Sequence, residues 1–168
     1  MVTVFVKKNN TLSQEFYDSI VDGINFSSVH CTCGHCGCLT RHAYYYRIVR
    51  FKSSVVVLKI LRVKCSQCGK THAVLLSSIV PYSQIPLEDQ IEIISNYDSG
   101  SDFMAVLDSN FLIDPREVYR IISNYRRFWK QRLISEKITS FENIVTDCFR
   151  LFDLQFMQIR WSPGILFC

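Results

Sequence analysis

Two Cys-x-x-Cys-Gly motifs are the part of this sequence best suited to chemistry. The first spans Cys33–Gly37 and the second spans Cys65–Gly69, with a basic, β-branched segment between them. Two thiolates in a tight turn form half of a tetrahedral zinc site, and the glycine after the second cysteine lets the backbone fold under the sulfurs. We predict one structural zinc ion bound by Cys33, Cys36, Cys65 and Cys68. Because four thiolates fill its coordination shell, the ion would stabilise the fold and would not catalyse.

Further cysteines and histidines surround the two motifs. Cys31 and Cys38 flank the first motif without forming another Cys-x-x-Cys turn, so it stays open whether either replaces a ligand or binds a second metal. His42 and His72 are expected just outside the zinc ligands. A disulfide framework is the alternative, but residues 1–8 lack the pattern of a secretory leader, which favours a reducing, cytoplasmic compartment.

The two motifs can meet only if the segment between them forms a hairpin. Tyr44–Phe51 and Val55–Val63 have the β-branched and aromatic composition of strands, and residues 52–54 provide a turn. This pattern predicts an antiparallel zinc ribbon over residues 27–82. Residues 1–26 are expected to form an arm, a strand followed by a helix, that packs on the ribbon.

Residues 84–168 have the pattern of a helical domain. One helix is expected at Pro86–Tyr97 and a short one at Asp102–Asp108. The third helix has the clearest start, because Asp114 is a good N-cap, Pro115 suits the first helical position and Glu117 completes a capping box. This order over residues 86–135 is typical of a helix-turn-helix. The expected fold class is therefore α+β, with a small zinc ribbon followed by an all-helical helix-turn-helix domain.

Charge is unevenly distributed along the chain. The net charge is +4, yet no aspartate or glutamate occurs between Asp22 and Glu88, and the third helix is basic on one face. Such surfaces suit phosphate contacts. Near the start of the third helix, arginine and asparagine could read bases of double-stranded DNA, while later basic residues hold phosphates. The predicted nucleic-acid contacts are Arg47, Arg50, Lys52, Arg116, Arg120, Asn124, Arg127 and Lys130.

The residues around the cysteine motifs resemble a known family. The first motif, Arg41–Arg47, Cys65–Leu76 and Val80–Tyr82 look like the zinc-binding front end of bacterial insertion-sequence transposases. They are more similar still to short, uncharacterised transposon-associated proteins of bacteria. The resemblance covers residues 30–135 and implies that the ribbon and the helix-turn-helix recognise element DNA, with Cys33, Cys36, Cys65 and Cys68 as metal ligands. Full transposases of this kind continue into an RNase-H-like domain, for which the remaining residues are too few, so no enzymatic activity is expected.

These observations predict a zinc-stabilised DNA-binding protein of a mobile element. It would act in the bacterial cytoplasm, at the nucleoid when bound to DNA, as a transposase-like accessory factor or repressor. One alternative is a phage or plasmid inhibitor or adaptor whose basic surface engages a nucleic-acid-handling protein. Another is RNA binding, with Tyr44 and Tyr46 stacking on unpaired bases.

The C-terminal segment, residues 149–167, is rich in large apolar side chains. We expect it to pack on the helical domain, to pair with a second copy or to bind a protein partner. Charged residues interrupt the segment, so no membrane span is expected.

Overall fold

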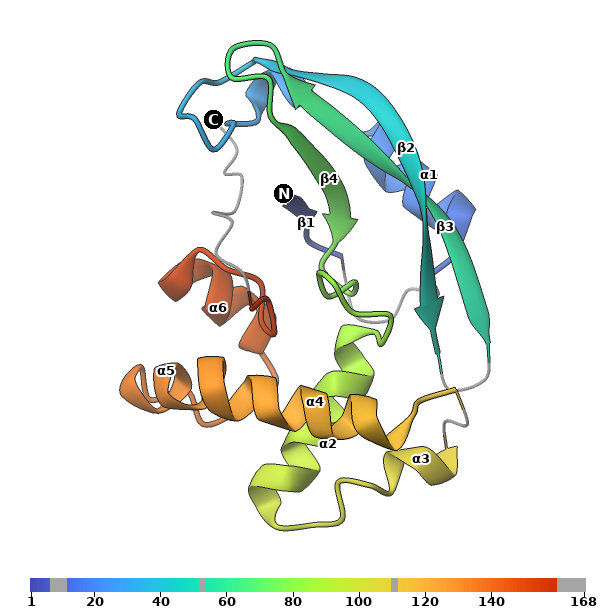
Figure 1. Ribbon diagram of the computed structural model, residues 1–168. Coiled ribbons are helices and arrows are strands. Elements are labelled where there is room, and N and C mark those ends of the chain that lie inside the picture. Colours follow the sequence, from blue (N-terminus) through green and yellow to red (C-terminus); the bar gives the residue numbers. More distant parts are fainter. Residues whose placement is uncertain (7–11, 52–53, 110–111, 160–168) are drawn as a thin grey trace.

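A sheet and a group of helices make up the α+β fold (Figure 1). The computed structural model describes residues 1–6, 12–51, 54–109 and 112–159. Within these ranges the sheet has four strands in the order β1-β4-β3-β2. None of the helices in the described ranges is long and apolar enough to cross a membrane.

Two long strands form the hairpin that joins the cysteine motifs. Strand β2 (Leu39–Arg50) pairs antiparallel with β3 (Val55–Cys65), and Leu39 lies opposite Cys65. The predicted strands are thus confirmed, and both extend as far as the cysteine motifs. Strand β4 (Thr71–Leu76) pairs antiparallel with β3, and β1 (Val2–Val4) pairs parallel with β4. The second motif is therefore the turn between β3 and β4.

The N-terminal arm packs on the sheet through helix α1 (Gln14–Asp22), as expected. The Ser13 hydroxyl caps the helix by accepting a hydrogen bond from the N–H of Phe16 at 3.1 Å. The buried Tyr17 hydroxyl donates to the carbonyl of Val74 and accepts from the N–H of Leu61, both at 2.9 Å. These bonds lie where the ladder between β3 and β4 has ended, so Tyr17 satisfies backbone groups that the strands leave unpaired. A short 3-10 turn, η1 (Phe26–Ser28), then leads to the first cysteine motif.

The helices follow the predicted order with changes in length. Helix α2 (Leu87–Ser99) ends at Gly100 in the left-handed conformation, and α3 (Val106–Ser109) is shorter than expected. Helix α4 (Pro115–Asn124) begins with the predicted capping box. A π-helical turn, η2 (Tyr125–Trp129), connects it directly to α5 (Lys130–Ser135), and α6 (Ile144–Phe152) follows.

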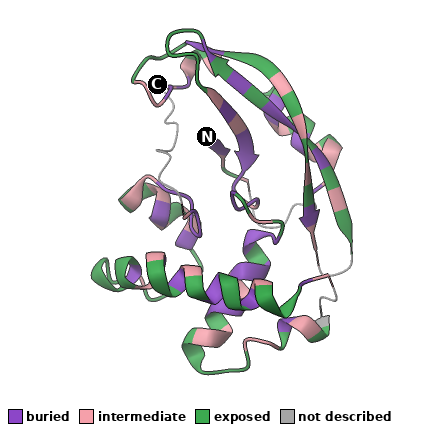
Figure 2. Cartoon of the chain, in the orientation of Figure 1, coloured by how far each residue is buried: buried purple, intermediate pink, exposed green. Residues whose placement is uncertain are grey.

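Buried side chains form two clusters, which Figure 2 shows as purple segments on the sheet and on the helices. One cluster lies between the sheet and α1, and the other lies among α2, α4 and the C-terminal segment. Trp129 is fully buried, contacts the ring of Phe156 and donates its indole N–H to the carbonyl of Gln158 at 3.2 Å. The C-terminal segment thus packs on the helices up to Gln158. Residues 160–168 of that segment lie outside the described ranges.

Candidate metal centre

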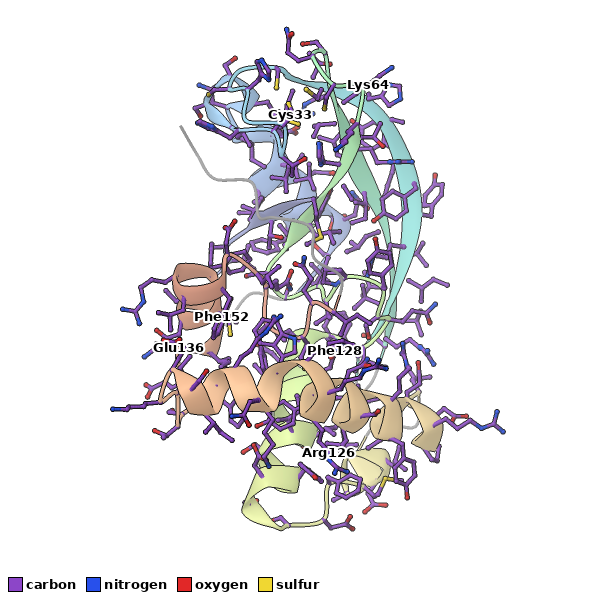
Figure 3. The ribbon with its side chains drawn as sticks, turned by 60° about the vertical axis from the view of Figure 1, so that its left-hand side comes forward. Cys33, Lys64, Arg126, Phe128, Glu136 and Phe152 are labelled. Atoms are coloured by element: carbon purple, nitrogen blue, oxygen red, sulfur yellow. The ribbon has the colours of Figure 1, made fainter. Side chains whose placement is uncertain are left out.

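Four thiols form a compact group at the end of the sheet that is distant from α2–α6 (Figure 1), where Figure 3 labels Cys33. The sulfur atoms of Cys31, Cys33, Cys65 and Cys68 all lie within 4.8 Å of one another. The Cys31 and Cys68 sulfurs are 3.6 Å apart, and the Cys33 and Cys65 sulfurs are 3.8 Å apart. Two thiolates on one tetrahedral zinc ion, each about 2.3 Å from it, would be about 3.8 Å apart. The group could therefore hold a metal ion.

The second motif presents its two thiols from a closed turn. The N–H of Cys65 donates to the carbonyl of Lys70 at 2.9 Å, and the N–H of Gly69 donates to the carbonyl of Cys65 at 3.0 Å. Gly69 has a φ of 71°, which a side chain would disfavour. The N–H of Cys68 also points at the Cys65 sulfur, 3.3 Å away. Both ligand atoms of this motif are thus held on the same side of the turn.

The first motif contributes Cys33, and Cys31 comes from the residues just before it. The N–H of Cys31 donates to the carbonyl of His35 at 2.8 Å, which closes a loop around Cys33. Cys36 pairs with His30 in an isolated antiparallel bridge at the base of this loop, and its sulfur lies 3.5 Å from the carbonyl of Ser27.

Three of the four predicted ligands, Cys33, Cys65 and Cys68, therefore come together, while Cys36 lies outside the group. Cys31 occupies the place expected for Cys36, a substitution that the spacing left open.

The protonation of the four thiols is uneven. Burial raises the pKa of Cys65, but hydrogen bonds from the N–H groups of Cys68 and Gln67 and from the Cys38 thiol outweigh it, and the pKa falls to about 6. Hydrogen bonds from the backbone and imidazole of His35 lower the pKa of Cys33. Burial raises the pKa of Cys31 to about 12.

At neutral pH and without metal, Cys65 is therefore mostly a thiolate, whereas Cys31 is protonated. A metal ion would displace the proton from Cys31 when it binds.

Two further side chains touch the group. The Cys38 sulfur lies 3.3 Å from that of Cys65, and the Nε2 of His72 lies 3.3 Å from the Cys31 sulfur. Burial, together with the nearby Met1 amino group and Lys70, lowers the pKa of His72 to about 4, so its imidazole is neutral at neutral pH. His72 is thus next to a candidate ligand, as expected, whereas His42 is exposed on β2.

Two of the predicted nucleic-acid contacts have partners within the protein. The guanidinium of Arg47 donates to the carbonyls of Val80 and Ser83 at 2.6 and 2.7 Å. That of Arg50 donates to the carbonyl of Leu112 at 2.9 Å and to the carboxylate of Glu117 at 2.6 Å. Arg47 therefore ties β2 to the loop after β4, and Arg50 ties it to the helical region. Lys52 lies outside the described residues.

The predicted contacts on the third helix lie in different surroundings. Arg116, Arg120 and Arg127 are exposed, and Asn124 is half-buried. The ammonium of Lys130 forms an ion pair with Asp98 at 2.7 Å. We define the basic face as the exposed arginines of α4 and η2, which are Arg116, Arg120, Arg126 and Arg127. Exposed Tyr119 lies beside these arginines on α4. Tyr119 was not predicted as a surface residue from the sequence, because an aromatic residue in a helix is usually part of the core.

Comparison with known proteins identifies one related segment. Residues 30–106 match a family described as a domain of unknown function (DUF6431), which is somewhat less than half of the chain. The matched segment contains all four candidate ligands, the hairpin, β4 and α2, and it ends before α4. No curated protein and no solved structure matches the chain.

Proposed function

We propose that this chain is a metal-stabilised DNA-binding protein that contacts the duplex through α4. The observation that carries the proposal is the basic face. Between Glu117 and Glu136 the sequence has no acidic residue, and the four arginines of this face project from one continuous helix. Arg120 lies 3.9 Å from the carboxylate of Glu117, which Arg50 also binds. An exposed row of arginines is suited to the phosphates and base edges of a groove.

The order of the helices supports a helix-turn-helix mode of binding. Helix α2 packs against α4, and the single turn of α3 lies between them in sequence. In this mode the last helix enters the major groove and its first turns contact bases. Arg116, Arg120 and Asn124 would then read bases, and Arg126 and Arg127 would hold phosphates. Lys130 could join them only by giving up its ion pair with Asp98.

The cysteine group would have a structural role in this protein. Four thiolates favour zinc among common metals and leave no coordination site for a substrate. The ion would tie the loop before β2 to the turn between β3 and β4, and it would lie far from the basic face, as Figure 3 shows for Cys33 and Arg126. The resemblance to transposase front ends supports an accessory factor or repressor that recognises the DNA of a mobile element.

The proposal is tested by selecting DNA from a random duplex library with zinc-loaded protein and with chelator-treated protein. We expect an enriched motif that disappears without zinc. Arg120→Ala should weaken binding at one base position, whereas Arg127→Ala should weaken it for every sequence. Arg150→Ala, an exposed arginine on α6, is the matched control and should have no effect. Retention without enrichment, or an equal loss for all three variants, would contradict recognition through α4.

An exposed patch on the hairpin favours a protein partner as a second candidate. Tyr46 and Ile48 on β2 lie beside Lys59 and Val57 on β3, and Tyr46 is 75% exposed. An apolar surface of this kind is typical of an interaction site. If the chain is an adaptor, a protein partner will remain bound to it after nuclease treatment. The Tyr46→Ser variant will not retain this partner.

A further inference from the structure

A cavity of about 800 Å³ lies against one face of the sheet. Tyr45 and Arg47 of β2, Arg62 of β3 and Leu75 of β4 line its floor, because alternate residues of paired strands share a face. Lys70 borders it near the cysteine group, and Tyr82 borders it from the loop after β4. The volume is within the range of about 300–1,000 Å³ typical of pockets for small molecules.

The charged side chains that line this cavity are basic. Arg47, Arg62 and Lys70 are among its described lining residues, and no aspartate or glutamate is. Among the described residues, no carboxylate forms an ion pair with Arg62 or Lys70. Positive groups gathered in a concave site without counter-charges attract an anion.

The arginines of the cavity are also held in place. The two carbonyls that bind Arg47 fix its guanidinium, and its buried Nε has no hydrogen-bond partner. Arg62 is oriented by a hydrogen bond to the hydroxyl of Thr71. A guanidinium whose position is already fixed binds a phosphate with little loss of side-chain entropy.

An aromatic ring stands at the border of the cavity in a strained backbone conformation. Tyr82 has a φ of 62°, which is rare for a bulky residue, and its side chain is 69% exposed. Such conformations recur at sites that clamp ligands. Tyr45 presents a second ring on the floor of the same cavity. Tyr45 and Tyr82 thus bring two aromatic rings to the lining of this cavity.

We propose that this cavity binds a nucleotide, with its phosphate on Arg62 and Lys70 and its base against Tyr82, at the end of the cavity where Arg47 lies. Arginine and lysine are the usual phosphate donors in proteins, and stacking on tyrosine accepts any base. The ligand is either a free nucleotide or an unpaired nucleotide of a strand, since both offer the same phosphate and base. The site is separate from the basic face and does not depend on duplex binding.

Calorimetric titration of the zinc-loaded full chain tests this inference. The ligands are thymidine 5′-monophosphate, thymidine, inorganic phosphate and a single-stranded tetrathymidylate. We expect the monophosphate to bind more tightly than thymidine or phosphate alone. Equal affinity for the monophosphate and the tetranucleotide would identify a free nucleotide as the ligand, and much tighter binding of the tetranucleotide would identify a strand. Failure of both nucleotide ligands to bind would overturn the proposal.

Variants assign the binding to the cavity. Tyr82→Gly removes the ring and relieves the backbone strain, so the protein should fold while nucleotide affinity falls about tenfold or more. Tyr82→Phe keeps the ring and should keep the affinity. Arg62→Gln can retain the bond to Thr71 and should also weaken binding about tenfold. Unchanged affinity in both Tyr82→Gly and Arg62→Gln would overturn the proposal.

A matched variant separates this inference from the proposed function. Arg126→Gln, on the basic face, should weaken duplex binding and leave the affinity for thymidine 5′-monophosphate unchanged. Arg62→Gln should do the reverse. If duplex DNA does not bind at all while the monophosphate does, the proposal for α4 fails and the cavity stands.

Discussion

Replacing Cys31 by serine tests which thiols form the metal centre. Serine has the size of cysteine and a hydroxyl that is a poor zinc ligand, so the change removes one ligand with little effect on packing. Structural zinc sites have apparent binding free energies of about 10–16 kcal/mol, so each of four thiolates contributes about 3 kcal/mol. Because about 1.4 kcal/mol corresponds to a tenfold change, Cys31→Ser should weaken zinc binding roughly 100-fold.

The assay is competition for zinc between the protein and a chromophoric chelator at neutral pH. Cys36→Ser is the matched control, because Cys36 lies on the same loop but outside the group of four sulfurs. Its zinc affinity should stay within a factor of a few of the original. The opposite outcome, with affinity lost in Cys36→Ser and kept in Cys31→Ser, would refute the ligand set seen in the structure and restore the one expected from the Cys-x-x-Cys spacing.

Three further predictions concern stability, pH and salt. Tyr17→Phe leaves two buried backbone groups without partners, so urea denaturation should show that the free energy of unfolding falls by about 2–4 kcal/mol. A fall below about 0.5 kcal/mol would contradict the role of the hydroxyl. The Cys31 thiol has a pKa raised to about 12 and is protonated at neutral pH, so zinc binding should release protons and weaken as the pH falls. Calorimetric titrations in buffers of different ionisation enthalpy measure the proton release, and its absence would contradict Cys31 as a ligand. If Arg126 and Arg127 contact phosphates, the log–log salt dependence of duplex binding should have a slope of about −1.8, and a slope near zero would exclude these contacts.

The secondary structure was largely predictable because its signals are local. The capping box that starts α4 joins residues three positions apart, and the structure shows both of its hydrogen bonds. The strands of the hairpin were recognised from β-branched and aromatic composition. The π-helical turn was not predicted, because the sequence from Tyr125 to Trp129 has ordinary helical spacing.

The candidate site was predictable only in part. That cysteines from both motifs would meet followed from their spacing and from the hairpin between them. The choice between Cys31 and Cys36 did not follow, because it depends on a loop closed by the bond from Cys31 to His35 and on the bridge between His30 and Cys36.

The sequence by itself thus determined the strands, the main helices, the likeness of the cysteine motifs to a metal site and the basic character of α4. Only the tertiary structure decided which sulfur completes the group and that basic residues of three segments line one cavity. It also decided that Arg47 binds carbonyls of the loop after β4 and that Arg50 binds a carbonyl just before α4. The physical reason is distance along the chain. Caps and strand composition act between neighbours, whereas a ligand set, an ion pair or a cavity depends on how residues tens of positions apart are brought together when the chain folds.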